Sequence, residues 1–144
     1  MDTDVLSSFA KIERLPLLFA VFDQDTLNIA AAVENEVKTG ISKGFSFSND
    51  IIALQTQRQI RTYHTSPVDQ EFMNSLPQTL EAGERGSMAL CKRFAATLVS
   101  NERRVMHHCQ TNGIHCINLA DILRLLWELK IFNPNRCQRN YKQA

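Results

Sequence analysis

The sequence lacks several patterns that would assign it to a familiar class. Four cysteines in 144 residues are too few for a disulfide scaffold. The longest apolar stretch, residues 15–22, contains one proline and is far too short to span a bilayer, and no signal-peptide pattern opens the chain. Neither GxGxxG nor GxxxxGK[ST] occurs, so the usual nucleotide-binding signatures are missing. We therefore expect a cytoplasmic protein without a disulfide framework or a nucleotide loop.

The composition is that of a folded protein, with 44% hydrophobic and 22% charged residues. The net charge of +1 hides an asymmetry between the two halves of the chain. Residues 1–75 hold ten acidic and six basic side chains, whereas residues 76–144 hold five acidic and ten basic ones. The second half is the side that can meet a polyanion, although solvated charged faces explain the pattern equally well.

Hydrophobic periodicity predicts helices that alternate with short strands. Gly40 is expected to end the third helix, and Ser48 or Asn49 is expected to cap the fourth. The helices are expected at residues 5–12, 17–22, 30–38, 50–58, 68–76, 83–93, 102–111 and 119–129, and the strands at 27–29, 60–65, 95–99 and 114–117.

The alternation favours an α/β fold, a three-layer α/β/α sandwich on a short, mainly parallel sheet. We expect residues 1–132 to form a single domain and residues 133–144 to form a basic, loosely held tail.

Acidic residues recur at the starts or inner faces of the expected helices: Asp2 or Asp4, Glu36, Glu84 and Glu102. Carboxylates from separate elements repel one another at one spot unless a hard divalent cation such as Mg²⁺ or Mn²⁺ lies among them. Such a cluster performs metal-assisted hydrolysis of phosphodiesters. Each acid also has a structural interpretation, as a helix cap, a solvated helix residue or a first-turn residue that the helix dipole stabilises.

Two other chemistries fit the sequence less well. Residues 107–116 contain three histidines and two cysteines, but their spacing matches no CxxC or HxxxH pattern, and Cys109 and Cys116 fit a helix core face and a buried strand. The pair Asp2 and Asp4 is spaced like the nucleophile pair of aspartate-based phosphatases, but the companion lysine and acidic-pair motifs are not found. Zinc binding and phosphatase chemistry are thus disfavoured.

Four segments together resemble the PIN-domain family of metal-dependent nucleases. Residues 2–7 (DTDVLS) resemble its opening Asp-Thr-x-Val-Leu segment, residues 33–37 (VENEV) its second acidic motif, and residues 83–90 (GERGSMAL) its Gly-Glu-led helix. Residues 98–103 (LVSNER) fall where the family has a strand that runs into an acidic pair. The family includes the VapC-like toxins of toxin–antitoxin pairs, so the resemblance implies a ribonuclease with Mg²⁺ or Mn²⁺.

The resemblance assigns roles to four acids. Asp2, Glu36 and Glu84 stand in the places of metal ligands, and Glu102 in the place of a further catalytic acid. It also implies RNA as substrate, an antitoxin protein as partner, and a homodimer. Basic residues near these acids, namely Arg85, Arg103 and Arg104, are expected to bind the RNA backbone through salt-sensitive contacts.

Two positions depart from the family pattern. Only Met1 precedes Asp2, so the strand that usually precedes the first aspartate and forms the middle of the sheet is missing from this sequence. Asn101 stands where an aspartate is expected. The alternative to a nuclease is therefore a catalytically degenerate PIN-like module that binds RNA or a partner protein without cleavage.

Overall fold

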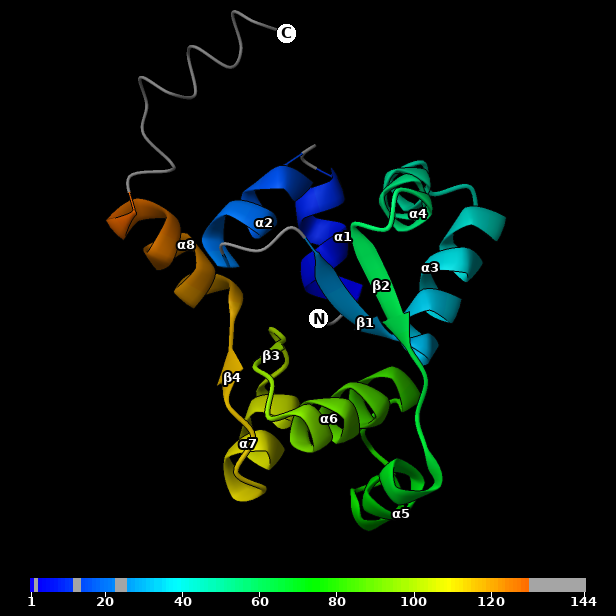
Figure 1. The fold of residues 1–144 in the computed structure, drawn as a ribbon, viewed down its shortest axis with the longest axis vertical. Coiled ribbons are helices and arrows are strands. Elements are labelled where there is room, and N and C mark those ends of the chain that lie inside the picture. Colours follow the sequence, from blue (N-terminus) through cyan, green and yellow to red (C-terminus); the bar gives the residue numbers. More distant parts are fainter. Residues whose placement is uncertain (2, 12–13, 23–25, 130–144) are drawn as a thin grey trace, which may run out of the picture.

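The computed structural model describes residues 1, 3–11, 14–22 and 26–129, and within them helices alternate with short strands (Figure 1). The predicted tail, residues 133–144, lies outside the described residues. None of the helices within the described ranges is both long and apolar enough to cross a membrane. These helices are α1 (Thr3–Lys11), α2 (Leu15–Phe22), α3 (Ala31–Ser42), α4 (Phe47–Thr56), α5 (Pro67–Ser75), α6 (Ala82–Phe94), α7 (Arg103–Thr111) and α8 (Leu119–Glu128).

The strands of the described segments form two separate parallel pairs. The strand β1 (Leu27–Ala30) pairs with β2 (Ile60–Tyr63), and β3 (Leu98–Val99) pairs with β4 (Cys116–Ile117). Helices α3 and α4 lie between β1 and β2 along the chain, and α7 lies between β3 and β4, as parallel crossovers require. The α/β class with short parallel strands is thus confirmed.

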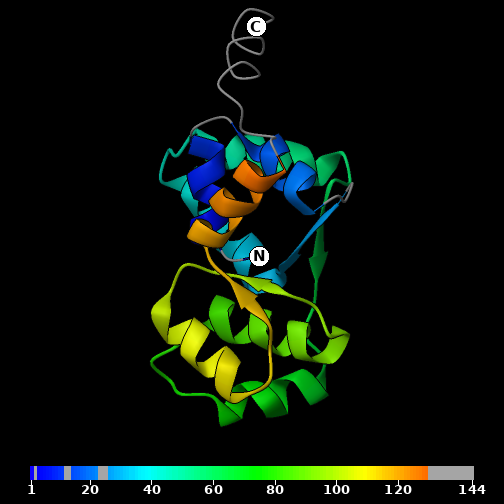
Figure 2. The ribbon, with the colours of Figure 1, turned by 90° about the vertical axis from the view of Figure 1, so that its left-hand side faces the viewer.

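Two clusters of buried apolar side chains hold these elements together. Leu6, Leu18 and Val33 belong to the first cluster, which α1 to α4 and the β1–β2 pair surround, in the upper part of Figure 2. The second cluster lies around α7 and the β3–β4 pair. Helix α6 serves both, because Leu90 packs into the first cluster and Met88 into the second. A fully buried side chain of this size contributes about 1.5–3 kcal/mol to folding.

The predicted boundary at Gly40 is wrong, because α3 continues to Ser42. Gly40 is buried inside α3, and a Cβ atom there would lie only 2.6 Å from the hydroxyl oxygen of Ser48 on α4. The glycine therefore permits the close packing of α3 against α4. The turn comes instead at Gly44, whose φ of 82° is in the left-handed region.

The predicted caps of the fourth helix are also wrong. Ser48 and Asn49 lie inside α4, which begins at Phe47, and Ser48 is buried against α3. Ser66 and Pro67, by contrast, start α5 as predicted, with a capping box between Ser66 and Asp69. The strand expected at residues 95–99 is shorter, because Ala95 is the left-handed residue that ends α6.

Candidate functional site

The carboxylate of Glu36 lies where three helices meet. The hydroxyl of Thr3, at the start of α1, donates a hydrogen bond to Glu36 Oε2. Gly83, in the first turn of α6, lies so close that a Cβ atom there would be 2.6 Å from Glu36 Oε1. Glu36 itself follows β1 by six residues along the chain, in the second turn of α3. Residues 33 and 47 positions away in the sequence thus converge on one carboxylate.

Gly83 has a structural reason to be a glycine. Its side of α6 faces Glu36 and Val33 of α3, and a methyl group would displace the carboxylate. The close approach also brings Glu36 to the amino end of α6, where the helix dipole favours negative charge. The sequence pattern singled out Glu84 but missed the role of the glycine before it.

Glu84 is buried, with 7% of its surface exposed. Its Oε2 accepts a hydrogen bond of 2.9 Å from the backbone N–H of Glu81, which precedes α6. The position near the helix start, expected from the sequence, is confirmed. The capping contact is a structural role, and the metal-binding role remains a prediction.

Glu102 and Asn101 lie in the turn between β3 and α7. Glu102 is the N-cap residue of α7, its side chain is half-buried, and its backbone N–H donates to the hydroxyl of buried Ser100. Asn101 is exposed. The structure therefore confirms that both residues follow the carboxyl end of a strand, while the catalytic role of Glu102 is not tested.

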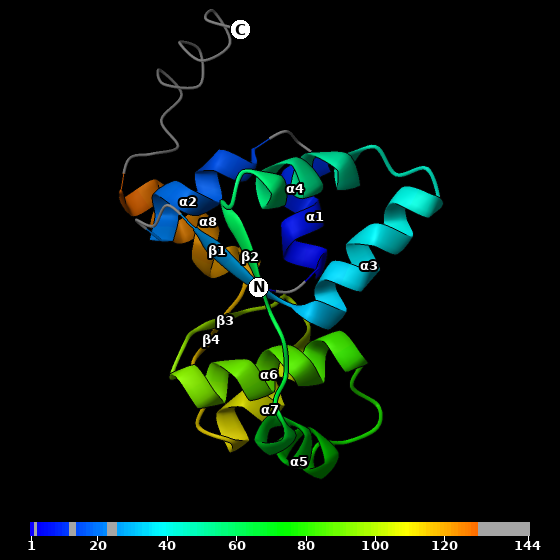
Figure 3. The same ribbon diagram turned by 45° about the vertical axis from the view of Figure 1, so that its right-hand side comes forward.

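Asp2 and the side chain of Asp4 lie outside the described residues. Both neighbours of Asp2, however, are attached to the same region. The amino group of Met1 donates a 2.9 Å hydrogen bond to the carbonyl oxygen of Asn28 in β1, and the Thr3 hydroxyl bonds to Glu36. Figure 3 shows the amino terminus next to β1. The role predicted for Asp2 stays a prediction.

Comparison with known families decides the class of protein. The family model DUF3368, described as a PIN domain, matches residues 1–137. The chain belongs to the PIN-domain family. Searches of curated proteins and of solved structures gave no match.

The acids of this PIN domain provide hard oxygen donors for a divalent cation. Mg²⁺ is commonly held by one or two carboxylates and keeps several waters, and Glu36 and Glu84 offer carboxylates from α3 and α6. Because residue 83 has no side chain, the Glu36 carboxylate has the room to lie at this end of α6. Within the described ranges, which omit Asp2, no group of three or more His, Cys, Asp or Glu residues is placed to hold a metal. The metal-binding role of the two glutamates stays a prediction.

The three cysteines within the described residues, Cys91, Cys109 and Cys116, fit a structural role. Cys109 is fully buried, as predicted, whereas Cys116 in β4 is only half-buried rather than buried. A hydrogen bond with Cys116 and burial both raise the pKa of the Cys109 thiol. Burial likewise raises the pKa of Cys91.

The three arginines predicted to bind RNA differ in their surroundings. Arg103 is exposed on α7. Arg104 donates to the carbonyl oxygen of Thr79 at 3.0 Å. Arg85 follows Glu84 on α6, and its buried Nε atom has no hydrogen-bond partner within the described structure. The RNA contacts themselves remain a prediction.

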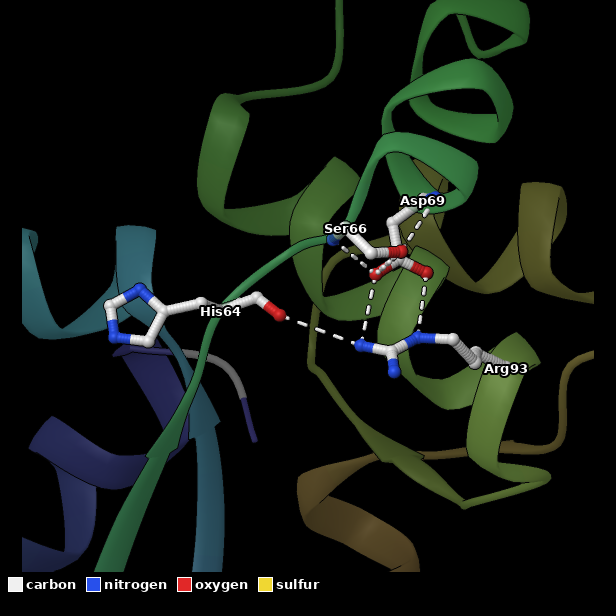
Figure 4. Close-up of polar contacts among 4 residues, drawn as sticks. All are labelled: His64, Ser66, Asp69 and Arg93. Atoms are coloured by element: carbon white, nitrogen blue, oxygen red, sulfur yellow. Dashed lines mark hydrogen bonds and ion pairs between the residues drawn. The ribbon is translucent and has the colours of Figure 1, made fainter.

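One polar cluster that the sequence did not reveal holds the other end of α6 (Figure 4). Arg93 makes two contacts of 3.0 Å with the carboxylate of Asp69, which is 3% exposed, and also donates to the carbonyl oxygen of His64. Burial raises the pKa of Asp69, but the hydrogen bonds from Ser66 and Arg93 outweigh it and leave that pKa below its usual value. The pair fixes α5 against α6 and so supports the helix that carries Gly83 and Glu84.

Proposed function

We propose that this PIN domain is a metal-dependent ribonuclease that hydrolyses RNA phosphodiester bonds with Mg²⁺ or Mn²⁺. The observation that carries the proposal is the position of the Glu36 carboxylate over Gly83, one residue before the buried Glu84. Asp2, Glu36 and Glu84 are the proposed metal ligands, and Glu102 the proposed further catalytic acid. Membership of a family that includes nucleases supports the same function.

The residues of the chain have distinct tasks in this proposal. Thr3 holds the Glu36 carboxylate in one orientation through its hydroxyl, and the amino end of α6 offsets the repulsion between the carboxylates. A divalent cation bound there supplies an activated water and neutralises charge on the scissile phosphate. Arg103, which is exposed, is the first candidate for the RNA backbone, and Arg85 and Arg104 are further candidates.

We infer that RNA is the substrate, that the protein acts in the cytoplasm as the toxin of a toxin–antitoxin pair, and that it forms a homodimer and binds an antitoxin protein. The resemblance of residues 2–7 and 83–90 to the VapC-like branch supports these assignments.

Cleavage of labelled single-stranded RNA by the purified full chain in Mn²⁺ tests the proposal. Glu36→Gln keeps the shape of the side chain and removes its charge, so cleavage should fall about 100-fold. Glu34→Gln is the matched control on the same helix, because Glu34 pairs with Lys38 at 2.7 Å, and it should cleave like the parent. Equal activity of the two variants, or no Mn²⁺ affinity by calorimetry, would contradict the proposal.

A second candidate is a degenerate PIN module that binds RNA or a protein without cleaving. Asn101, which carries no charge where an acid is expected, and the capping bond that occupies one oxygen of Glu84 favour it. It predicts RNA binding of equal strength in Mn²⁺ and in EDTA, with intact RNA recovered afterwards. Metal-dependent cleavage that Glu36→Gln abolishes would rule it out.

A further inference from the structure

Helix α8 has large apolar side chains on the side that faces solvent. Leu123 and Trp127 lie one turn apart, and 52% and 69% of their surfaces are exposed. The opposite side of the helix is a core face, because Ile122 and Leu126 are buried in the first apolar cluster. Single exposed leucines are common on protein surfaces, but a leucine and a tryptophan on adjacent turns form a continuous apolar ridge.

Helix α2 adds a second exposed apolar surface. It lies beside α8 and packs against it (Figure 1), and none of its eight residues is polar or charged. Leu15, Leu18 and Val21 are buried, whereas Pro16 and Ala20 are exposed. A helix that is apolar on every side is normally buried on every side. Two neighbouring helices thus both expose apolar surface that a partner can bury.

The charged residues of α8 indicate what this partner is. Arg124 and Glu128 are exposed, lie one turn apart, and flank the ridge of Leu123 and Trp127 on the same side of the helix. Neither of them forms an ion pair with another residue that the structure describes. The edge of the apolar ridge therefore offers one positive and one negative charge to a partner.

A second copy of the same helix matches this order of charges. When two identical helices pack antiparallel about a twofold axis, Arg124 of one copy lies opposite Glu128 of the other, and the symmetry repeats the pair. The axis then passes next to residue 126, so the two Trp127 rings come together beside it. A parallel pair in register would place identical charges opposite each other, which is unfavourable.

The size of this surface determines how strong the contact is. A standard interface buries about 800 Å² on each partner. A helix of ten residues is about 15 Å long, so α8 alone provides only part of that area and α2 has to contribute. We therefore expect a weak dimer with a dissociation constant in the micromolar range rather than a permanent one.

We propose that α8, together with the neighbouring α2, is the contact surface between two copies of this chain. The two α8 helices pack antiparallel, with Leu123 and Trp127 in the centre and reciprocal ion pairs between Arg124 and Glu128 at the edge. The inference rests on the homodimer of the proposed function and gives it an interface, and it is tested without any measurement of RNA cleavage.

The first test measures dimer formation by the full chain over a range of concentrations. Sedimentation gives the dissociation constant, and fluorescence reports on the interface itself, because Trp127 is the single tryptophan of the sequence and its emission should shift to shorter wavelength as the dimer forms. Leu123→Lys should weaken dimerisation about 10-fold or more. Val68→Lys is the matched control, because Val68 is equally exposed but lies on α5, and it should dimerise like the parent.

The second test exchanges the charges. Arg124→Glu leaves only acidic residues at the edge of the ridge and Glu128→Arg leaves only basic ones, so each variant alone should dimerise about 10-fold more weakly than the parent. A mixture of the two variants should recover the parental affinity as a heterodimer, because each copy then meets the opposite charge. Circular dichroism checks that all variants keep the parental fold.

Three outcomes would overturn the inference. If the chain dimerises but Leu123→Lys and Val68→Lys do so equally well, the homodimer stands and its interface lies elsewhere. If the mixture of the two charge variants associates no better than either variant alone, the helices do not pair as proposed. If the chain stays monomeric at every concentration, no second copy covers α8. A loss of RNA cleavage in Glu36→Gln with unchanged dimerisation concerns the nuclease proposal alone.

Discussion

The hydroxyl of Thr3 donates to the carboxylate of Glu36, and this bond joins the start of α1 to the second turn of α3 across 33 residues of sequence. Thr3→Val removes the hydroxyl while keeping the shape of the side chain. Because outer partners of a ligand orient it, we expect Mn²⁺ affinity and cleavage to fall about 10-fold. Calorimetry and the RNA assay measure the two effects. Thr3→Ser keeps a hydroxyl and should show the parental Mn²⁺ affinity and cleavage. If the serine variant is as weak as Thr3→Val, the hydrogen bond from the hydroxyl does not explain the effect.

Gly83→Ala should lower cleavage without lowering the stability of the protein. A Cβ atom there would lie 2.6 Å from Glu36 Oε1, the far end of a flexible side chain, so the carboxylate can move aside. Alanine is favoured over glycine inside a helix by about 1 kcal/mol, which offsets the crowding. We therefore expect a Tm near that of the parent, together with a loss of Mn²⁺-dependent cleavage of about 10-fold or more.

Gly86→Ala is the matched control on the same helix. Its Cβ atom would have no neighbour closer than 3.8 Å, so the methyl group fits, the Tm should rise, and cleavage should stay at the parental rate. If Gly86→Ala lost as much cleavage as Gly83→Ala, contact with Glu36 would not explain the effect.

Arg93→Met should cost far more stability than Lys38→Met. The first change leaves the carboxylate of Asp69, which is 3% exposed, without its cation; because the side chain of Arg93 is itself 36% exposed, the cost should lie below the about 3–5 kcal/mol of a fully buried pair. The second change breaks an exposed pair with Glu34 on one helix, worth about 0.3–0.5 kcal/mol. Urea unfolding followed by circular dichroism measures both. A similar loss of unfolding free energy in the two variants would contradict the prediction that the burial of Asp69 makes its ion pair more important for stability.

The free energy of unfolding should decrease as the pH falls below about 4.5. The hydrogen bond from Lys38 is the main cause that lowers the pKa of Glu34 from 4.5 to about 2. The pKa of Asp69 lies below 3.8, because its hydrogen bonds outweigh its burial. A carboxyl whose pKa is lower in the folded state stabilises the protein above its unfolded pKa, and this contribution disappears as the pH falls through the folded value. Urea titrations between pH 5 and about 2 should show the decrease, with a smaller slope in Lys38→Met.

Local chemistry made part of this structure predictable. Ser66 and Pro67 predict a helix start because the cap and the proline act within one turn. Helix α6 also starts with a capping box, between Glu81 and Glu84, whereas α7 has no side-chain cap. The prediction at Gly40 was wrong because the sequence does not distinguish a glycine that ends a helix from a glycine that lets a neighbouring helix pack closely. Only the approach of Ser48 on α4 distinguishes the two.

The candidate site was only partly predictable for a related reason. The sequence indicated Glu36 and Glu84 as acids near helix starts or inner faces, but their relation to Thr3 and Gly83 arises from tertiary packing of α1, α3 and α6. The bidentate contact between Asp69 and Arg93 joins residues 24 positions apart, and neither residue belongs to a recognisable motif. Contacts between distant residues such as these depend on how whole helices pack against one another, and local sequence patterns do not predict that packing.

Helix α6 has consequences for how the protein unfolds. Its 13 residues carry Leu90 into one apolar cluster and Met88 into the other, with Gly83 at one end and Arg93 at the other. If either apolar cluster of the described structure loses its packing, α6 loses contacts on that side, and the other cluster, which also packs against α6, is weakened. The two clusters should therefore melt together in one cooperative transition, and a ligand bound at the amino end of α6 protects apolar contacts far from itself.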